Sequence, residues 1–407
     1  MNAKQLGSIL NNDINNILAA VSGPQTTPAE YKKVVMHLLE AKPGVLAQNV
    51  GMPDPVIYRT QVATPWDKYT AEVTRTIWPE IPGEQAQWQP AAMRRLLEAG
   101  TDPLTLTIEA CRERGVPIVA SYRMNAEDFY GGELDLYDFG RQHKDLRIPG
   151  RTCLDPAHPE VFEHRMEIFT EVANTYDVDG IEFDFRRWCF MVSEPHKNHT
   201  VLTRMVAETR KMLSEVAQRK GRRKLLLGAR VGPMLDGPFN QDEFPGATKG
   251  SPTNLSCTDL GLDVRTWVQE GLVDYLCPTL FWPRWPGLPR TKEFVERTRG
   301  TDIGVYPTLW PLPGWLDEGA PLESDDRQRL LRYKNELCHL ALQVYEDGAD
   351  GISTFNWMPH HQPGMVAKPM RKEWGLGAIK LQMHIHPLLS DRRMLETYLE
   401  ADVALSS

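Results

Sequence analysis

The chain has few cysteines for its length, and they are not grouped. Its 407 residues include six cysteines, which are spread singly and never as Cys-x-x-Cys. Disulfide frameworks and thiolate metal sites both need closely spaced cysteines. The histidine pairs also lack an i, i+4 spacing on a predicted helix with a third ligand nearby; they are His196 with His199, His360 with His361, and His384 with His386. We therefore predict no metal site, no cofactor and a reducing compartment.

An excess of positive charge and a long apolar run are also absent. The net charge is −8, so we expect no nucleic-acid partner held by phosphate electrostatics. No apolar run approaches the length that spans a membrane. Residues 1–20 are polar and rich in asparagine, unlike a signal peptide. These features predict a cytoplasmic protein with no membrane partner, although a secreted chain trimmed of its signal would look the same.

The order of predicted elements indicates an α/β fold. Hydrophobic residues make up 41% of the chain, as in ordinary globular proteins. Predicted strands alternate with predicted helices, which is typical of a parallel sheet, and eight such strands favour a closed (β/α)8 TIM barrel. The strands are expected at residues 45–51, 74–78, 117–125, from Asp179-Gly180 onward, 224–231, 273–282, 303–310 and 350–357. Within one domain, 1–407, we expect an N-terminal helical extension (1–40), the barrel (41–360) and a C-terminal helical tail (361–407).

The most informative segment is Asp179-Gly180-Ile181-Glu182-Phe183-Asp184-Phe185-Arg186-Arg187. Side chains in a strand alternate between faces, so Glu182, Asp184 and Arg186 share one face and the apolar residues share the other. Unpaired charge is costly to bury, so the charged face must enter a cavity that pairs or solvates it. In parallel barrels, function is found at the carboxyl ends of the strands. We interpret this segment as an active-site strand.

Polar and aromatic residues at the ends of the other predicted strands would meet at the same barrel mouth. Carboxylates surrounded by hydrogen-bond donors and an aromatic rim suit cleavage of a glycosidic bond. The predicted catalytic residues are Asp184 and Glu182. The predicted substrate-binding residues are Asp54, Arg123, Asn125, Arg186, Arg230, Trp282, Tyr306, Trp310, Asn356 and Trp357. The alternative, a structural ion network of the carboxylates with the arginines, explains a single pair better than the whole set.

The two carboxylates are expected to differ in role. Asp184, nearer the strand tip, is predicted to act as the acid or the nucleophile, and Glu182 to raise its pKa or orient it. Same-face neighbours on a strand lie roughly 6–7 Å apart at Cα, so they can share a proton but can hardly flank a sugar. A second catalytic group is therefore expected from a loop. The candidates are Asp54, Glu127, Asp128 and Asp236.

Four arginines would make the mouth basic in an otherwise acidic protein. Arginine binds carboxylate and sulfate groups through paired hydrogen bonds, which favours an anionic sugar, either uronic or sulfated. The alternative is that these arginines only hold Glu182 and Asp184 in place, and the sequence leaves both open. The residues concerned are Arg123, Arg186, Arg187 and Arg230.

Ser121-Tyr122-Arg123-Met124-Asn125 together with the segment 179–187 resembles the glycoside-hydrolase-like, family-10-like barrel proteins. The resemblance runs from about Val45 to Trp357 and implies a barrel and glycoside chemistry, without naming a substrate. Retaining glycosidases of the best-known clan carry a nucleophilic Glu on strand seven, and residues 305–310 contain no carboxylate. Two acids on strand four are more similar to the substrate-assisted chitinase-like enzymes, whose longer Asp-x-x-Asp-x-Asp-x-Glu pattern is matched only in part.

Three functions remain open at this point. The first is a glycoside hydrolase. The second is a lyase or isomerase in which Tyr306 or a carboxylate removes a proton next to a uronate. The third is a non-catalytic sugar-binding barrel, which the missing strand-seven acid favours. Each predicts a carbohydrate partner, and an oligomer is possible.

Overall fold

Parallel strands form a single sheet in the centre of the molecule. The computed structural model describes residues 2–14, 17–18, 21, 26–77, 83–124, 137–186, 190–238, 240, 242–243, 255–280, 287–310, 324–357 and 385–406. The strands are β1 (Ser8–Asn12), β2 (Val45–Gly51), β3 (Ile118–Arg123), β4 (Gly180–Asp184), β5 (Leu226–Val231), β6 (Tyr275–Pro278), β7 (Gly304–Val305), β8 (Thr308–Leu309) and β9 (Ile352–Trp357). Their order is β7-β6-β5-β4-β3-β2-β1-β9-β8.

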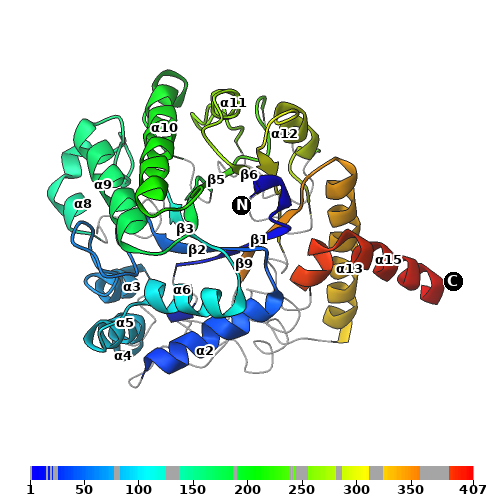
Figure 1. Ribbon diagram of the computed structural model, residues 1–407, viewed down its shortest axis with the longest axis horizontal. Coiled ribbons are helices and arrows are strands. Elements are labelled where there is room, and N and C mark those ends of the chain that lie inside the picture. The colour runs from blue at the N-terminus through cyan, green and yellow to red at the C-terminus, as the bar shows by residue number, and fades with distance from the viewer. Residues whose placement is uncertain are drawn as a thin grey trace.

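β7 and β8 are two halves of one barrel strand. β7 pairs with β6, and β8 pairs with β9. Between them, the N–H of Tyr306 donates to Leu276 O (2.8 Å), and Pro307 O accepts from the N–H of Ser353 (2.9 Å). The nine segments therefore occupy eight strand positions and close into a ring. The predicted (β/α)8 barrel is confirmed, and Figure 1 shows the helices arranged around it.

β1 corrects the expectation that residues 1–40 form only a helical extension. It is hydrogen-bonded between β2 and β9, so it is a full member of the barrel. Ile9 lies in the interior cluster, while Leu10 faces the core beneath the helices. The predicted strand at 74–78 is correspondingly wrong, because Thr70–Ile77 is helix α3 and Trp78 lies outside the described residues. The residues expected as the first strand are therefore the second.

Helices flank the strands and begin and end at residues with recognisable capping chemistry. Before α6, the Asp102 carboxylate accepts a hydrogen bond from the N–H of Thr105 (2.7 Å), and Gly115 ends the helix at φ +66°, which glycine adopts without strain. The described helices are α2 (Pro28–Leu38), α3, α4 (Gly83–Ala86), α5 (Trp88–Glu98), α6 (Pro103–Arg114), α8 (Asp138–Gln142), α9 (Pro159–Thr175), α10 (Pro195–Arg219), α11 (Val264–Gln269), α12 (Thr291–Arg297), α13 (Ser324–Glu346) and α15 (Arg392–Ser406), with short 3-10 turns η1 (Ala3–Gln5), η2 (Leu39–Ala41) and η3 (Lys144–Leu146).

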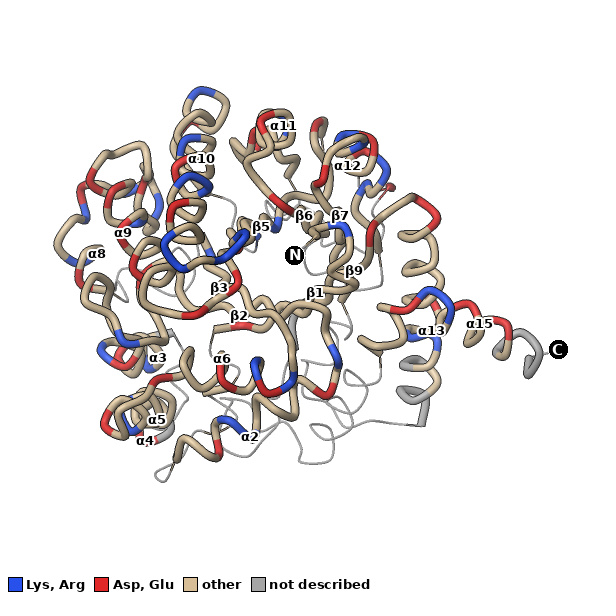
Figure 2. The backbone as a smooth tube through the Cα atoms, in the orientation of Figure 1, with Lys and Arg blue, Asp and Glu red and all other residues tan. Residues whose placement is uncertain are grey.

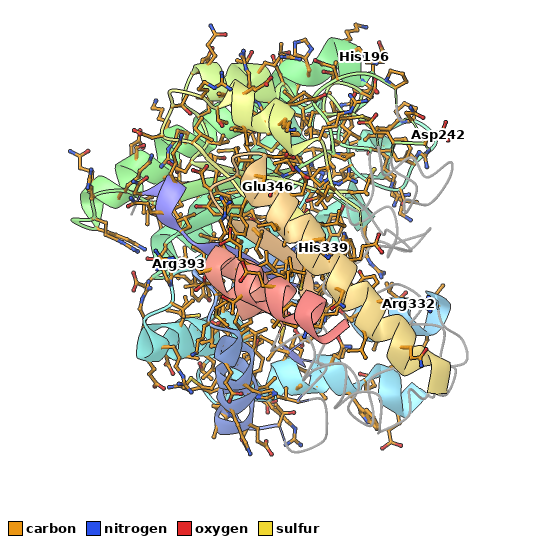
Figure 3. All side chains as sticks on the ribbon, turned by 90° about the vertical axis from the view of Figure 1, so that its right-hand side faces the viewer. His196, Asp242, Arg332, His339, Glu346 and Arg393 are labelled. Carbon is orange, nitrogen blue, oxygen red and sulfur yellow. The ribbon has the colours of Figure 1, made fainter. Side chains whose placement is uncertain are left out.

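The C-terminal helices pack on the outside of the barrel against α13. A helical segment, residues 385–390, and α15 share a buried cluster with α13 that includes Leu337, Leu389 and Leu395. Figure 3 shows α15 lying across α13, and Figure 1 shows the chain ending at the outer tip of α15. Of the predicted tail, residues 361–384 lie outside the described residues. The grouping of the whole chain into one domain stays a prediction. Among the described helices, none is long and apolar enough to cross a membrane.

Candidate active site

β4 presents the two faces that strand alternation predicts. Ile181, Phe183 and Phe185 lie in the large cluster between the barrel and the helices. Glu182 and Asp184 point into the barrel and are fully buried. Buried carboxylates need hydrogen bonds and counter-charges, and the neighbouring strands supply both.

Asp184 lies in a row of alternating charge across three strands. The register pairs Arg123 of β3 with Asp184 and Asp184 with Arg230 of β5, and all three side chains are fully buried. Asp184 Oδ1 accepts from Arg230 Nε (2.9 Å) and from the backbone N–H of Arg186 (3.0 Å). Asp184 Oδ2 lies 3.7 Å from Arg123 Nε and accepts no hydrogen bond within the described part of the chain. The two oxygens of Asp184 therefore differ, since only Oδ1 accepts hydrogen bonds from described residues.

Two residues that sequence reasoning missed complete this row. Asp13, which follows β1, forms an ion pair with Arg123 (2.7 Å). The ring of Phe355 on β9 lies under both guanidiniums, 3.8 Å from that of Arg230 and 5.2 Å from that of Arg123. A period-two reading of β9 would have found Phe355, because it puts Ser353 and Phe355 on one face.

Glu182 lies one pleat deeper and has a different set of partners. Its Oε1 accepts from Asn11 Nδ2 and from the Ser121 hydroxyl, both at 2.9 Å, and its Oε2 accepts from the Tyr275 hydroxyl at 3.0 Å. Burial, followed by the negative charge of Asp184, raises the pKa of Glu182 to about 7. The two carboxyl groups therefore differ, since Asp184 faces cations whereas Glu182 faces neutral donors.

The raised pKa predicts a pH-dependent stability. Between pH 4.5 and about 7 the folded chain keeps the Glu182 proton that the unfolded chain releases. The stabilisation is fully present below pH 4.5 and lost as the pH rises through about 7, a total of about 3 kcal/mol. Glu182→Gln does not titrate. In denaturant unfolding at about pH 5 and about pH 8, its free energy of unfolding relative to wild type should rise by about 2.5 kcal/mol at the higher pH, because part of the loss has already occurred at pH 5. The prediction fails if the free energies of unfolding of the two proteins change in parallel with pH. The control is Glu98→Gln, because Glu98 is exposed.

The remaining predicted binding residues are not all at the mouth. Tyr306 is fully buried at the amino end of the barrel, where its hydroxyl donates to Ala3 O (2.7 Å) and accepts from the N–H of Leu6 (3.0 Å). It therefore closes the barrel floor rather than lining the mouth. Trp310 follows β8; its Nε1 donates to Leu280 O (2.8 Å), and its ring meets the Phe355 ring edge-on at 4.9 Å. Trp310 thus lies beside the Phe355–Arg230 pair.

Asp54 and Asp236 are both bound to other residues. Asp54, in the loop after β2, accepts from the N–H of Thr64 (2.8 Å) and hydrogen-bonds His164 of α9 (3.0 Å). Burial raises the pKa of Asp54. Asp236 is half exposed and binds Arg265 and Thr258. Neither forms a hydrogen bond or ion pair with Asp184 or Glu182 in the described part of the chain.

Of the other predicted residues, Arg186 is fully buried two residues beyond Asp184. Asn125, Trp282, Arg187, Glu127 and Asp128 lie outside the described residues. Asn356 and Trp357 belong to β9, but their side chains are not among those described.

Comparison with known proteins gives partial sequence matches. No family model matches the chain. Over 212 residues it is 28% identical to Glycosyl hydrolase DigH of Escherichia coli (strain K12), and equally to that of Shigella flexneri, covering 45% of this chain and 47% of theirs. The chain thus spans about half the length of the curated relatives it matches. Similarity to proteins named glycosyl hydrolases agrees with the expected resemblance to glycoside-hydrolase-like proteins. The more specific likeness to family 10 stays a prediction.

Solved structures show weak overall similarity. An alpha-L-fucosidase isoenzyme 2 from Paenibacillus thiaminolyticus matches with a TM-score of 0.45 and 12% identity, covering 93% of this chain and 49% of that chain. A family GH18 chitinase from Cycas revoluta matches with a TM-score of 0.45 and 10% identity, covering 94% and 99%.

Proposed function

We propose that the chain is a glycoside hydrolase in which Asp184 is the reacting carboxylate. The observation that carries the proposal is the position of Asp184 between Arg123 and Arg230, at the carboxyl ends of neighbouring strands in a parallel barrel. Arg230 and the N–H of Arg186 fix one oxygen and leave Oδ2 to act on the substrate. Partial similarity to proteins named glycosyl hydrolases supports the same reaction class.

The substrate that we propose is an oligo- or polysaccharide with uronic or sulfated groups. The fully buried guanidiniums of Arg123 and Arg230 lie beside Asp184, and Arg186, two residues further along the chain, is also fully buried. In Figure 2, residues of both signs are interspersed over the surrounding helices, so this buried cluster differs from the outer surface. Guanidiniums bind carboxylate and sulfate oxygens more strongly than neutral hydroxyls.

The lyase alternative loses one of its two candidate bases. Tyr306 would have to reach a uronate at the mouth, yet its hydroxyl is bound to Ala3 and Leu6 at the opposite end. Burial also raises the pKa of Tyr306, which makes proton removal by a tyrosinate harder. A lyase would therefore have to use a carboxylate as its base.

Asp184→Asn tests the proposal. We expect it to reduce turnover at least about a hundredfold, because an amide can neither attack nor accept a proton. The assay measures products from neutral, uronic and sulfated oligosaccharides by mass spectrometry. Products that gain water indicate hydrolysis, whereas an unsaturated product that absorbs in the ultraviolet without added water indicates elimination.

A matched control uses another buried carboxylate of the same barrel. Asp274 precedes β6 at the opposite end and pairs with Arg210 (2.8 Å) and Lys224. Asp274→Asn should lower stability but keep turnover per folded molecule. Undiminished turnover by Asp184→Asn would refute the assignment. Binding of a panel sugar by the wild type, measured calorimetrically without any cleavage, would support the non-catalytic barrel instead.

A further inference from the structure

The hydrogen bonds of Glu182 define where a proton can sit on it. Oε1 accepts from Asn11 Nδ2, which can only donate, and from Ser121. This oxygen is therefore an acceptor whether Glu182 is neutral or ionised. Oε2 has a single described partner, the Tyr275 hydroxyl at 3.0 Å, which can donate or accept. The proton of a neutral Glu182 thus belongs on Oε2, directed at the Tyr275 oxygen.

Tyr275 is held against Glu182 by the shape of the barrel interior. The register places Glu182, Gly228 and Tyr275 in one row across β4, β5 and β6. A Cβ at position 228 would collide with the ring and hydroxyl of Tyr275, so only glycine leaves room for the ring to cross β5. On its far side the ring meets Tyr306 edge-on at 6.3 Å. The hydroxyl therefore has a fixed position.

We propose that Glu182 Oε2 and the Tyr275 hydroxyl form a proton-binding pair, and that Tyr275 is a positioning residue that sets the pH at which this pair takes up its proton. The consequence for function rests on the proposed glycoside hydrolase. Uptake of the proton adds one positive charge to the buried site, so an anionic sugar binds more tightly when the proton is present.

The groups facing Glu182 come from every neighbouring strand. The charged and titratable groups that act on it are Asp184 on β4, Arg230 on β5, and Tyr275 and Cys277 on β6, and the ion pair of Arg123 with Asp13 lies beside Asp184. Burial and Asp184 raise the pKa of Glu182, whereas Arg230 and the hydroxyl donors lower it. The opposing effects bring its titration to about pH 7.

The direction of the Tyr275→Phe effect follows from hydrogen-bond strength. A hydrogen bond from a hydroxyl to a carboxylate is roughly twice as strong as one to a neutral carboxyl group. Loss of the hydroxyl therefore destabilises the ionised form of Glu182 more than the protonated form. We expect the midpoint of the Glu182 titration to rise by about one pH unit.

The experiment is an infrared titration of the full chain without substrate, which keeps it independent of whether the protein is a hydrolase. Wild type should show a protonated-carboxyl carbonyl band that disappears with a midpoint near pH 7 and is missing in Glu182→Gln. Tyr275→Phe should move the midpoint upward, and so should Gly228→Ala, because its Cβ displaces the ring. Tyr306→Phe is the matched control; it removes a buried hydroxyl from the same interior cluster, and that hydroxyl binds Ala3 and Leu6.

Either of two results would overturn the proposal. A wild-type band that persists unchanged in Glu182→Gln would show that Glu182 does not hold the proton, and this arm needs no Tyr275 variant to fold. An unchanged or lowered midpoint in folded Tyr275→Phe would remove Tyr275 from the pair. With an active substrate, the KM for an anionic sugar should rise above the midpoint while that of a neutral sugar stays constant. If the KM values of the anionic and the neutral sugar depend equally on pH, then protonation of Glu182 does not act through the charge of the substrate.

Discussion

Arg230→Leu is expected to lower the free energy of unfolding by about 3–5 kcal/mol, because it removes one partner of a buried ion pair. Asp184 would keep the N–H of Arg186 on Oδ1 and Arg123 at 3.7 Å from Oδ2, but lose its closest cation. The guanidinium lies 3.8 Å from the Phe355 ring centre, a contact that leucine replaces only in part. Denaturant unfolding monitored by circular dichroism measures the loss.

A double variant distinguishes the cost of an unpaired buried charge from the cost of lost packing. If the cost comes from leaving Asp184 without its cation, then Asp184→Asn should restore much of the stability that Arg230→Leu removes. Arg230→Lys keeps the charge but not the planar fork, so its loss should be smaller. A single-variant loss below about 1 kcal/mol, the size of a surface ion pair, would contradict the buried-pair assignment.

The two faces of β4 could be predicted because all the information lies within a few residues. In residues 181–185 the apolar residues alternate with acids, and one face must be buried under helices whichever fold forms. The structure places Glu182 and Asp184 on the inner face accordingly. The side-by-side placement of Arg123, Asp184 and Arg230 needed only the rule that parallel strands share one end.

β1 could not be predicted because its stability comes from residues far away in the sequence. Its five residues, Ser-Ile-Leu-Asn-Asn, do not alternate polar and apolar side chains, so no period of two marks them as a strand. Asn11 hydrogen-bonds Glu182, Asn12 hydrogen-bonds Gln48, and Ser8 hydrogen-bonds His386. The strand expected at 74–78 takes the place that belongs to β1, because Thr70–Ile77 is helix α3, in which Ala71 and Val73 are buried. Asn11 and Asp13 are absent from the predicted site because β1 was not predicted as a strand.

His386 is expected to make the protein sensitive to acid. It lies in the helical segment 385–390, is 2% exposed, and hydrogen-bonds Ser8 of β1 (3.0 Å) and Thr354 of β9 (2.7 Å). Burial lowers the pKa of His386 from 6.5 to about 3. Between these pH values His386 is protonated in the unfolded chain and neutral in the folded chain. The stabilisation is therefore complete above pH 6.5 and lost as the pH falls towards 3, a total of about 5 kcal/mol.

Variants isolate this contribution from that of Glu182, which has the opposite sign over part of the same range. His386→Gln keeps hydrogen-bonding groups but does not titrate. Between about pH 7.5 and about pH 5, its free energy of unfolding relative to wild type should therefore rise by about 2 kcal/mol. The exposed His339 on α13, visible in Figure 3, is the control, because His339→Gln removes a histidine that solvent already hydrates. If His386→Gln loses as much stability in acid as wild type, the buried histidine is not the acid-sensitive link between the C-terminal helices and the barrel.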